Sequence, residues 1–471
     1  MKTNTNTKLE PRMIFVIISL AALTFMGILS ETSLNIAYSV LMNTFHVSAD
    51  TIQWLTTGYL LVLSIAIPIS PFLVRKFNTR YLFLCAIVTF SFGTILAASA
   101  VNFTFLLAGR LIMALGTGIS LPLLTNIVLE QAPKEQRGIL LGIVGLVTNF
   151  APALGPIYGG ILMQFLNWHF IFLFMIPILI CSAILGIKNI TDIRTNQKAV
   201  LDFISFVLIS ISLFCIVFAF SMSNSWNWDF RILGLFFLSI LVLLVFIIRQ
   251  LKLSSPFIEI RVFRYPMFST GILILMITQM SVLGFAFLFP LLLQKGLSCS
   301  SMLAALLLLP GAILNGIFCP FVGTLLRKHE PKVFLISGFF VLNMTEFIML
   351  FVCYKSYTVL ICYALFMFGA SMIQVPAQTN TLNQLPLQNN ADGSAIMNTL
   401  QQLAGAIGTA IASSILAQKT VLLLHENKKI DFAYRFAFRH SVYFFLILTL
   451  LGLLLAFSTK KEAVPSPTGD N

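Results

Sequence analysis

One acidic residue stands alone in the first apolar stretch of the sequence. Glu31 lies in MIFVIISLAALTFMGILSETSLNIAYSVL, and no other charged residue occurs between Arg12 and Asp50. A carboxylate at the centre of a bilayer costs roughly 3 kcal/mol unless it is protonated, paired or exposed to a water-filled cavity. We therefore expect Glu31 to be a functional residue, and proton carriage is the chemistry that suits it best.

Two further charged residues fall inside apolar stretches. Arg110 lies near the outer end of the stretch 104–128, at a depth similar to that of Glu31. We hypothesise that Arg110 pairs with deprotonated Glu31 and that protonation or substrate releases the pair; a permanent structural ion pair is the alternative. Glu346 lies within another stretch and is either a second proton site or a residue that pairs locally with Asn343 or with a neighbouring helix.

Apolar stretches that must position these residues make up most of the chain. It is 58% hydrophobic and 10% charged, with a mean hydropathy of +0.96, which is far from the composition of soluble domains. Fourteen stretches are long enough to cross about 30 Å of hydrocarbon. They are 13–38, 53–74, 81–100, 104–128, 139–164, 169–187, 203–222, 232–249, 267–293, 302–325, 333–354, 357–379, 394–417 and 438–458. The sequence predicts an all-α integral membrane protein with fourteen transmembrane helices.

Basic residues gather in alternate loops, and this asymmetry predicts the orientation. With a cytoplasmic N-terminus, the short outer loops hold only Arg231, Lys295 and Lys355, and the longer outer loop 418–437 is also basic. Such a bias follows the positive-inside rule, so the net charge of +13 needs no nucleic acid as partner. We expect a multi-pass protein of the bacterial cell (plasma) membrane with both termini in the cytoplasm.

Two similar segments divide the chain into halves. SPFLVRKFNTRYLFL (70–84) follows the second stretch, and GTLLRKHEPKVFLI (323–336) follows the tenth. Their basic residues, expected in cytoplasmic gating loops, are Arg75, Lys76 and Arg80 in the first and Arg327, Lys328 and Lys332 in the second. Two parallel six-helix halves are typical of alternating-access transporters. The predicted units are a tail 1–12, a six-helix bundle 13–188, a linker 189–266 with two extra transmembrane helices, a six-helix bundle 267–459 and a tail 460–471.

Glycines recur at helical spacing along the fifth stretch, GILLGIVGLVTNFAPALGPIYGGIL. Those that carry the pattern, with a proline, are Gly142, Gly155, Pro156, Gly159 and Gly160. Small residues let a neighbouring helix approach closely, and proline bends a helix. The pattern indicates a packing face, which is either ordinary tight packing or a seal that gates transport.

This pattern resembles the antiporter motif of the major facilitator superfamily, although Ala151 stands where that motif usually has Gly. ETSLNIA (31–37) resembles the first-helix signature of the fourteen-helix drug:proton antiporters of the EmrB/QacA type, which usually has Asp at the position of Glu31. Other segments similar to this branch are QWLTTGYLL (53–61), GRLIMALGTG (109–118), NWHFIFLFMIP (167–177) and the LD before the seventh stretch. TLQQLAGAIGTAIA (399–412) and Asn383-Gln384 are similar to its LmrB-like members.

There are departures from the family pattern. Arg75 occupies a position where the family usually has Asp, and Arg327 does the same in the second half. Met113 and Ala114 replace the usual Gln-Gly of the fourth helix. Because the acid is thought to help lock the outward-closed state, the resemblance implies that this chain stabilises that state in another way.

The resemblance implies a major facilitator fold and proton-driven multidrug efflux by alternating access. Its expected partners are amphipathic cationic or neutral drugs, protons and membrane lipids, with the proton as coupling ion, no other cofactor and a monomeric protein. A proton-coupled importer or a lipid or metabolite flippase of the same fold is the alternative. No phosphate-binding G-x-x-x-x-G-K-[ST] supports ATP-driven transport, and no polar catalytic cluster or metal-ligand spacing indicates an enzyme.

Aromatic and amide side chains within the stretches are the candidates for a drug-binding cavity. Such groups bind apolar cations without rigid geometry, although each is also a common interhelical hydrogen-bonding residue. The candidates are Asn35, Trp54, Tyr59, Asn126, Gln279, Asn315, Gln374 and Gln378.

Overall fold

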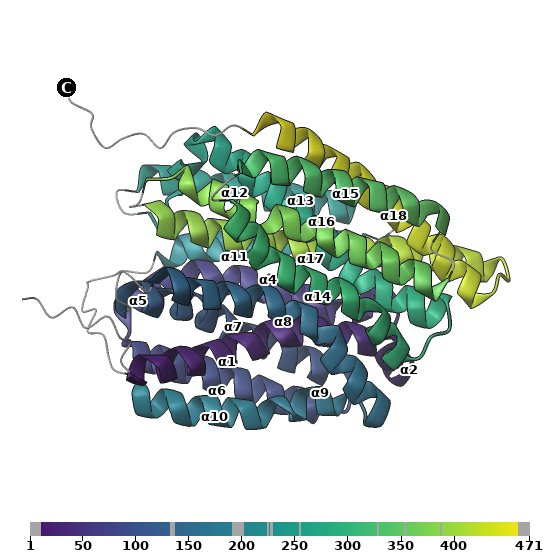
Figure 1. Ribbon diagram of the computed structural model, residues 1–471, viewed down its shortest axis with the longest axis horizontal. Coiled ribbons are helices and arrows are strands. Elements are labelled where there is room, and N and C mark those ends of the chain that lie inside the picture. Colours follow the sequence, from purple (N-terminus) through teal and green to yellow (C-terminus); the bar gives the residue numbers. More distant parts are fainter. Residues whose placement is uncertain are drawn as a thin grey trace, which may run out of the picture.

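The computed structural model describes residues 11–131, 137–190, 202–223, 226, 229–253, 256–326, 329–352, 355–386 and 389–459, and these parts are helical with short connections. The long helices run side by side (Figure 1). In the first half they are α1 (Pro11–Ser33), α4 (Trp54–Ala66), α6 (Thr79–Ala98), α7 (Phe103–Gln131), α8 (Arg137–Phe165) and α10 (Met175–Asn189). Two more follow, α11 (Phe203–Met222) and α12 (Phe230–Lys252). In the second half they are α13 (Pro266–Leu291), α14 (Ser301–Leu325), α15 (Pro331–Val352), α16 (Ser356–Asn383), α17 (Asn390–His425) and α18 (Ile430–Ser458).

Short elements extend or connect these helices. They are η1 (Leu34–Ala37), α2 (Tyr38–Phe45), α3 (Ala49–Ile52), η2 (Ile67–Ile69), α5 (Ser70–Lys76), α9 (His169–Leu173), η3 (Ile260–Arg264) and the π-helical turn η4 (Leu292–Gly296). We call the end of the molecule where α1 begins and α18 ends the terminal end, which is on the left in Figure 1, and the opposite one the far end.

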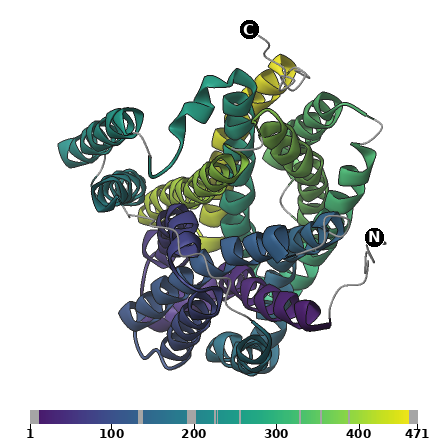
Figure 2. The same cartoon turned by 90° about the vertical axis from the view of Figure 1, so that its left-hand side faces the viewer.

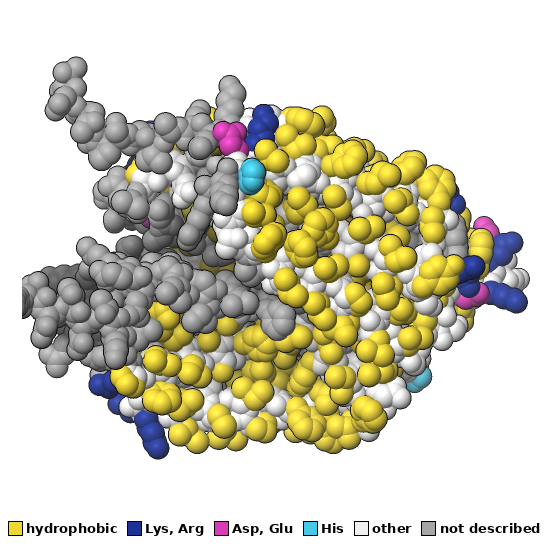
Figure 3. All heavy atoms as spheres, viewed as in Figure 1, with side chains coloured by type: hydrophobic (Ala, Val, Ile, Leu, Met, Phe, Trp, Pro, Cys, Tyr) yellow, Lys and Arg dark blue, Asp and Glu magenta, His cyan; other side chains and the backbone are white. Residues whose placement is uncertain are grey.

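Within the described residues, thirteen helical segments are long and apolar enough to cross a membrane. Helix α8, 29 residues long, is not one of these thirteen; it covers the predicted stretch 139–164 and packs between α1 and α14. Figure 3 shows apolar side chains covering the middle of the molecule, with the charged side chains in view near its two ends. The exposed apolar belt is the surface that a protein presents to lipid.

A break interrupts the first membrane-crossing segment just after Glu31. The segment was predicted as one helix, 13–38, but a 3₁₀ turn, η1, separates α1 from α2, and the segment ends only at Phe45. Hydroxyl groups precede the break: Ser30 donates to the Gly27 carbonyl at 2.7 Å, and Ser33 donates to the Ser30 carbonyl at 3.3 Å. Such side chains compete for the backbone carbonyls of a helix, and a 3₁₀ turn within a helix often marks a functional hinge.

The predicted outer loop 418–437 is wrong in its extent. Helix α17 ends at His425 and α18 already begins at Ile430, so most of this segment is helical. The start of α18 buries Ala433, Ala437 and Phe438 on one face, which is the spacing of an amphipathic helix. An ion pair one turn apart, Arg435 Nη2 to Asp431 Oδ2 at 2.8 Å, supports the same turn.

The helices form two groups with a separate pair at the side. Helices α1 to α10 pack with one another, and so do α13 to α18; α8 contacts α14, and α4 contacts α17 across the groups. Figure 2 shows α11 and α12 (teal) outside both groups, with α11 beside α4 and α17. Much of α12 is exposed, including Phe230, Phe237 and Ile248. This pair therefore faces lipid on one side and the seam between the two groups on the other.

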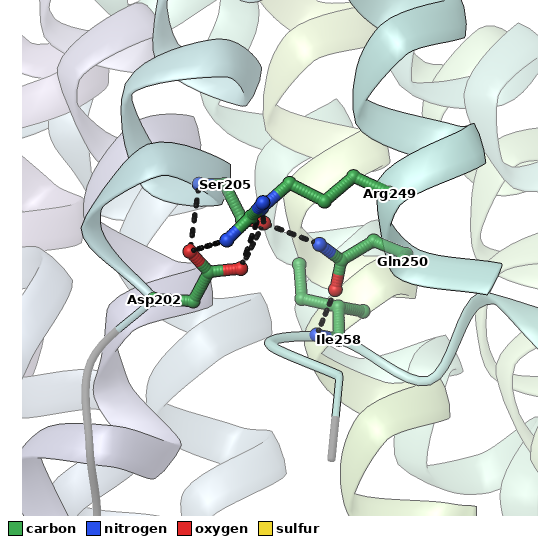
Figure 4. Close-up of polar contacts among 5 residues, drawn as sticks. All are labelled: Asp202, Ser205, Arg249, Gln250 and Ile258. Carbon is green, nitrogen blue, oxygen red and sulfur yellow. Dashed lines mark hydrogen bonds and ion pairs between the residues drawn. The ribbon is translucent and has the colours of Figure 1, made fainter. Parts of the chain in front are cut away.

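A polar cluster holds the α11–α12 pair together at the terminal end (Figure 4). Asp202, the N-cap of α11, accepts hydrogen bonds from Arg249 of α12 at 2.8 and 3.0 Å. Ser205 donates to Asp202 and accepts from Gln250, whose side-chain oxygen accepts from the backbone N–H of Ile258 at 3.2 Å. Burial alone would raise the pKa of the Asp202 carboxyl, but the hydrogen bonds from Arg249 and Ser205 and the guanidinium charge outweigh it and lower that pKa below its ordinary value.

Asp202→Asn is expected to lower the melting temperature of the purified protein at pH 7 by roughly 1–2 °C, because the bidentate pair is partly exposed. A carboxyl whose pKa is lowered by folding stabilises the protein above its unfolded pKa and loses this effect as the pH falls through the folded value. The difference between wild type and variant should thus shrink below about pH 4. Asp229→Asn, in the more exposed pair with Arg231, is the control and should melt like wild type. A difference that stays constant down to pH 3 would contradict the ionic origin.

Candidate functional site

Arg110 is fully enclosed by the surrounding helices. It lies on α7 and is 0% exposed. Its Nε donates to the Leu55 carbonyl at 3.2 Å, and its Nη1 donates to Ser30 Oγ at 3.0 Å. The guanidinium carbon lies 4.2 Å from the ring centroid of Tyr59, a cation–π contact. Nη2 is buried and makes no hydrogen bond to any described residue.

Tyr59 is part of the support for this guanidinium. Its hydroxyl donates to the Gly27 carbonyl at 2.9 Å and lies 2.7 Å from Thr117 Oγ1, so it joins α4 to α1 and α7. The sequence predicted Tyr59 as a cavity residue. In the structure its side chain is 0% exposed, because the ring packs against Arg110 and the hydroxyl is used between helices. Tyr59 therefore supports Arg110, and its role in a substrate cavity stays a prediction.

Glu31 lies in the last turn of α1, next to Ser30, which binds Arg110. Its side chain is 5% exposed, and among the described residues it makes no hydrogen bond and no ion pair. Its charge and that of Arg110 interact electrostatically without direct contact. The hypothesised direct pair is thus not formed here: Nε and Nη1 of Arg110 donate to Leu55 and Ser30, and Nη2 makes no hydrogen bond to a described residue. A small rearrangement at the break after Glu31 is what a direct pair would require.

The glycine-rich face of α8 packs against the helix end that carries Glu31. A Cβ on Gly155 would overlap Thr32 and lie 2.9 Å from the Ser33 nitrogen, and a Cβ on Gly159 would overlap the Ser33 carbonyl oxygen. Thr32 also donates to the Pro152 carbonyl at 2.9 Å. The close approach of α8 to α1 therefore requires these glycines. It places α8 against Thr32 and Ser33, directly after Glu31.

The remaining motif residues of α8 complete this seam. A Cβ on Gly160 would overlap Ala305 of α14, so the same helix contacts the second group of helices. Pro156 is buried beside these glycines. Gly142 lies in the part of α8 whose side-chain surroundings are outside the described residues. The predicted packing face is thus a three-helix seam of α1, α8 and α14.

Asn35 and Trp54 lie near the far end, and each contacts a helix outside its own group. Asn35 Nδ2 donates to the Ala286 carbonyl of α13 at 3.2 Å, and its Oδ1 accepts from Thr56. The Trp54 ring lies 5.9 Å from that of Phe218 on α11. Both were predicted as cavity residues; here Asn35 joins the two groups and Trp54 packs on the extra pair.

Amides of the second group take other positions. Asn315 on α14 donates to the Met367 carbonyl of α16 at 3.3 Å. Gln374 and Gln378 on α16 both donate to the side-chain oxygen of Gln401 on α17, at 3.0 and 3.5 Å. Asn126 of α7 and Gln279 of α13 are also half-buried. Gln401 was not predicted, although it stands beside Gln402 in an apolar helix, a signal of the kind that identified Glu31.

Glu346 lies away from Arg110, between α15 and α18. It is 0% exposed, and one carboxyl oxygen accepts a hydrogen bond from Thr449 of α18 while the other has no described partner. Asn343 donates to the Thr449 carbonyl at 3.2 Å and accepts from the Thr449 hydroxyl. Glu346 thus has a local contact with a neighbouring helix, and its role as a second proton site stays a prediction.

The basic loop residues lie at the terminal end. Lys76 closes α5, with Nζ 5.2 Å from the centroid of Phe72 and 5.8 Å from that of Phe77. Arg80 is exposed in the first turn of α6, and Arg75 lies in the last turn of α5. Arg327 and Lys328 lie outside the described residues.

Hydrogen bonds between the two helix groups cluster toward the far end. Besides Asn35 to Ala286, Gln294 donates to the Ile36 carbonyl at 2.9 Å, and Thr57 Oγ1 lies 2.8 Å from Thr409 Oγ1. Among the described residues, none joins the groups near the terminal end. The two groups are therefore held together at the far end, with Glu31 and Arg110 on the inner side of these contacts.

Comparisons with known proteins agree with this arrangement. The family model described as Major Facilitator Superfamily matches residues 20–409. The lincomycin resistance protein LmrB of Bacillus subtilis (strain 168) is 40% identical over 98% of this chain and 99% of its own length. LmrB of Listeria monocytogenes is 38% identical over 96% and 97%. The inward-facing, unoccupied structure of a bacterial homologue of the human lysosomal transporter Spinster superposes with a TM-score of 0.68, at 13% identity over 96% and 97%.

Proposed function

Because the chain belongs to the Major Facilitator Superfamily, we propose that it is a proton-driven antiporter that exports amphipathic, neutral or cationic antibiotics and other drugs by alternating access. The chain is a transporter and not an enzyme. Its relatives of 38–40% identity are named for resistance to lincomycin, which supports drug export as the direction and a drug as the cargo.

A single observation carries the proton coupling. Glu31 is buried without a hydrogen-bonding partner among the described residues. It lies in the turn that also carries Ser30, whose hydroxyl oxygen accepts a hydrogen bond from Arg110. Nη2 of Arg110 has no partner among the described residues and is a suitable donor for the charged carboxylate. An ionised Glu31 would turn toward this donor, whereas a protonated Glu31 is neutral and is buried in the seam at a much smaller cost than the carboxylate.

The close packing of α8 against α1 connects the protonation state of Glu31 to the arrangement of the helices. The glycines of α8 hold Thr32 and Ser33 at backbone distance, directly after Glu31 and before the break at η1. A change in the position of Glu31 therefore shifts the contact that joins the first helix group to α14. We propose that this shift opens the far-end contacts, such as Asn35 to Ala286, and so alternates access.

The orientation follows from charge. The positive-inside bias of the loops supports a terminal end that lies in the cytoplasm, with both termini inside the cell. With the far end closed by the hydrogen bonds between the two groups, the conformation described here is then inward-facing. The protein acts as a monomer in the lipid bilayer, with the proton as its coupling ion.

Reconstitution into liposomes tests the proposal. With an imposed pH gradient, lincomycin or ethidium should accumulate on the side of higher proton concentration, against its own gradient, and a protonophore should abolish the accumulation. Movement of drug in the same direction as protons would indicate the importer instead. Transport that is unchanged without a pH gradient would remove proton coupling.

A further inference from the structure

Three amide side chains of the second helix group meet at one acceptor. The Nε2 atoms of Gln374 and Gln378, one turn apart on α16, donate to Oε1 of Gln401 on α17 at 3.0 and 3.5 Å. With its oxygen used twice, Gln401 turns its own two N–H donors away from α16. The side chain of Gln401 is 6% exposed, and its Nε2 makes no hydrogen bond to any described residue.

Unpaired polar atoms are concentrated around this residue. Thr399 Oγ1 and Gln402 Oε1, within the same turn of α17, are also buried without a described partner. Each buried polar group without a hydrogen bond costs about 1–3 kcal/mol, and native structures contain few of them. Three in one helical turn are therefore expected to meet a partner that the described residues do not supply.

On α17 the cluster lies one to two helical turns before the residues that contact the first helix group. One turn beyond Gln401, a Cβ on Gly405 would lie 3.5 Å from Leu60 of α4. Ala406 and Thr409 contact Thr57 of the same helix. Gln402 shares this face of α17, because residues at i, i+4 and i+7 point in the same direction. The free groups thus lie beside the interface between halves, where substrate sites of such folds are built.

The two helices that carry the cluster have no charged residue near it. Helix α16 contains no Asp, Glu, Lys or Arg, and the nearest one along α17 before Gln401 is Asp392, about 14 Å away at 1.5 Å per residue. Of the buried charges among the described residues, Glu31 and Arg110 belong to the other helix group, and Glu346 of α15 accepts from Thr449 of α18. An amide cluster without a counter-charge suits neutral donors and acceptors and leaves an ionic group unpaired.

We propose that Gln374, Gln378, Gln401 and Gln402 form the hydrogen-bonding half of the substrate site, which takes the neutral hydroxyl- or amide-bearing part of an amphipathic compound. The two helix groups then have different roles: the first binds and releases the proton, and the second recognises uncharged polar groups of the cargo. This inference rests on the proposed drug transport and names the chemistry of its cargo.

Two transported probes test it in liposomes. Lincomycin carries sugar hydroxyls and an amide, whereas ethidium is a planar cation with neither. Gln401→Leu should raise the KM for lincomycin about tenfold or more and change the KM for ethidium less than twofold. Gln402→Met removes an unpaired acceptor without breaking any described hydrogen bond, so it should fold at least as well as wild type and shift the lincomycin KM in the same direction.

Gln418→Leu, an exposed residue of the same helix, is the matched control and should leave both KM values unchanged. Equal loss for both probes in the correctly folded Gln402→Met variant would overturn the inference, and so would unchanged KM values in both variants, which would mean that the cluster holds only water. Either result would leave drug transport by the wild type intact. Failure of the wild type to transport both probes would overturn the proposed function and this inference with it.

Discussion

Glu31→Gln is expected to reduce drug transport driven by a pH gradient by at least tenfold, to the level of liposomes without protein. Glutamine has nearly the shape of a protonated glutamate, so the packing of α1 against α8 should persist. It cannot, however, ionise and turn toward the free Nη2 of Arg110. Transport should be measured as substrate accumulation after a pH jump, together with the proton flux reported by a pH-sensitive dye in the lumen.

Glu426→Gln provides the matched control, because Glu426 is exposed after the end of α17. This variant should transport like wild type. Glu31→Asp keeps an ionisable group one methylene shorter and should retain part of the activity, with an altered dependence on lumenal pH. A Glu31→Gln protein that is well folded and transports at the wild-type rate against a gradient would show that the coupling proton binds elsewhere.

Gly159→Ala should have the second large effect. The added methyl group would overlap the Ser33 carbonyl oxygen, a backbone atom that no side-chain rotation can move. Overpacking of this kind costs typically 1–3 kcal/mol, and here it also pushes α8 away from the turn that follows Glu31. We expect a lower melting temperature in detergent and at least a tenfold loss of transport.

Gly234→Ala makes the same chemical change where space is free. A Cβ at Gly234, on the lipid-facing α12, meets no atom within 4 Å. Alanine is also the better helix former, so this variant should be as stable as wild type or slightly more so. If Gly159→Ala behaves like Gly234→Ala in both melting and transport, α8 and α1 do not rely on this close contact during the cycle.

Membrane crossing and the order of the spans could be predicted from the sequence. They depend on the cost of polar groups in hydrocarbon, which acts on each stretch separately and needs no knowledge of neighbours. Most predicted span limits lie within a few residues of the helices, as 203–222 shows for α11. Larger errors occur in the first segment, which continues to Phe45, and at the predicted loop 418–437, into which α17 and α18 extend. Amphipathic turns at helix ends have too few apolar residues to resemble a span.

Side-chain partners could not be predicted in the same way. Tyr59 looked like a cavity aromatic, but it supports Arg110; Trp54 looked similar, but it packs against Phe218 of the extra pair. Gln374 and Gln378 were identified as amides, whereas Gln401, which joins them, was not. These roles depend on which helix faces which, and the residues concerned lie tens to hundreds of positions apart.

Glu31 shows where the division falls. The sequence by itself predicted a functional role for this lone carboxyl, because a charge in an apolar helix has a cost that local composition reveals. Only the tertiary structure decided its surroundings: the break at η1, the glycine seam of α8, and an Arg110 that donates to Ser30 and Leu55 while its Nη2 has no partner among the described residues. The physical reason is that hydrophobic cost is a property of a segment, whereas hydrogen bonds and close packing are properties of pairs that only the folded chain brings together.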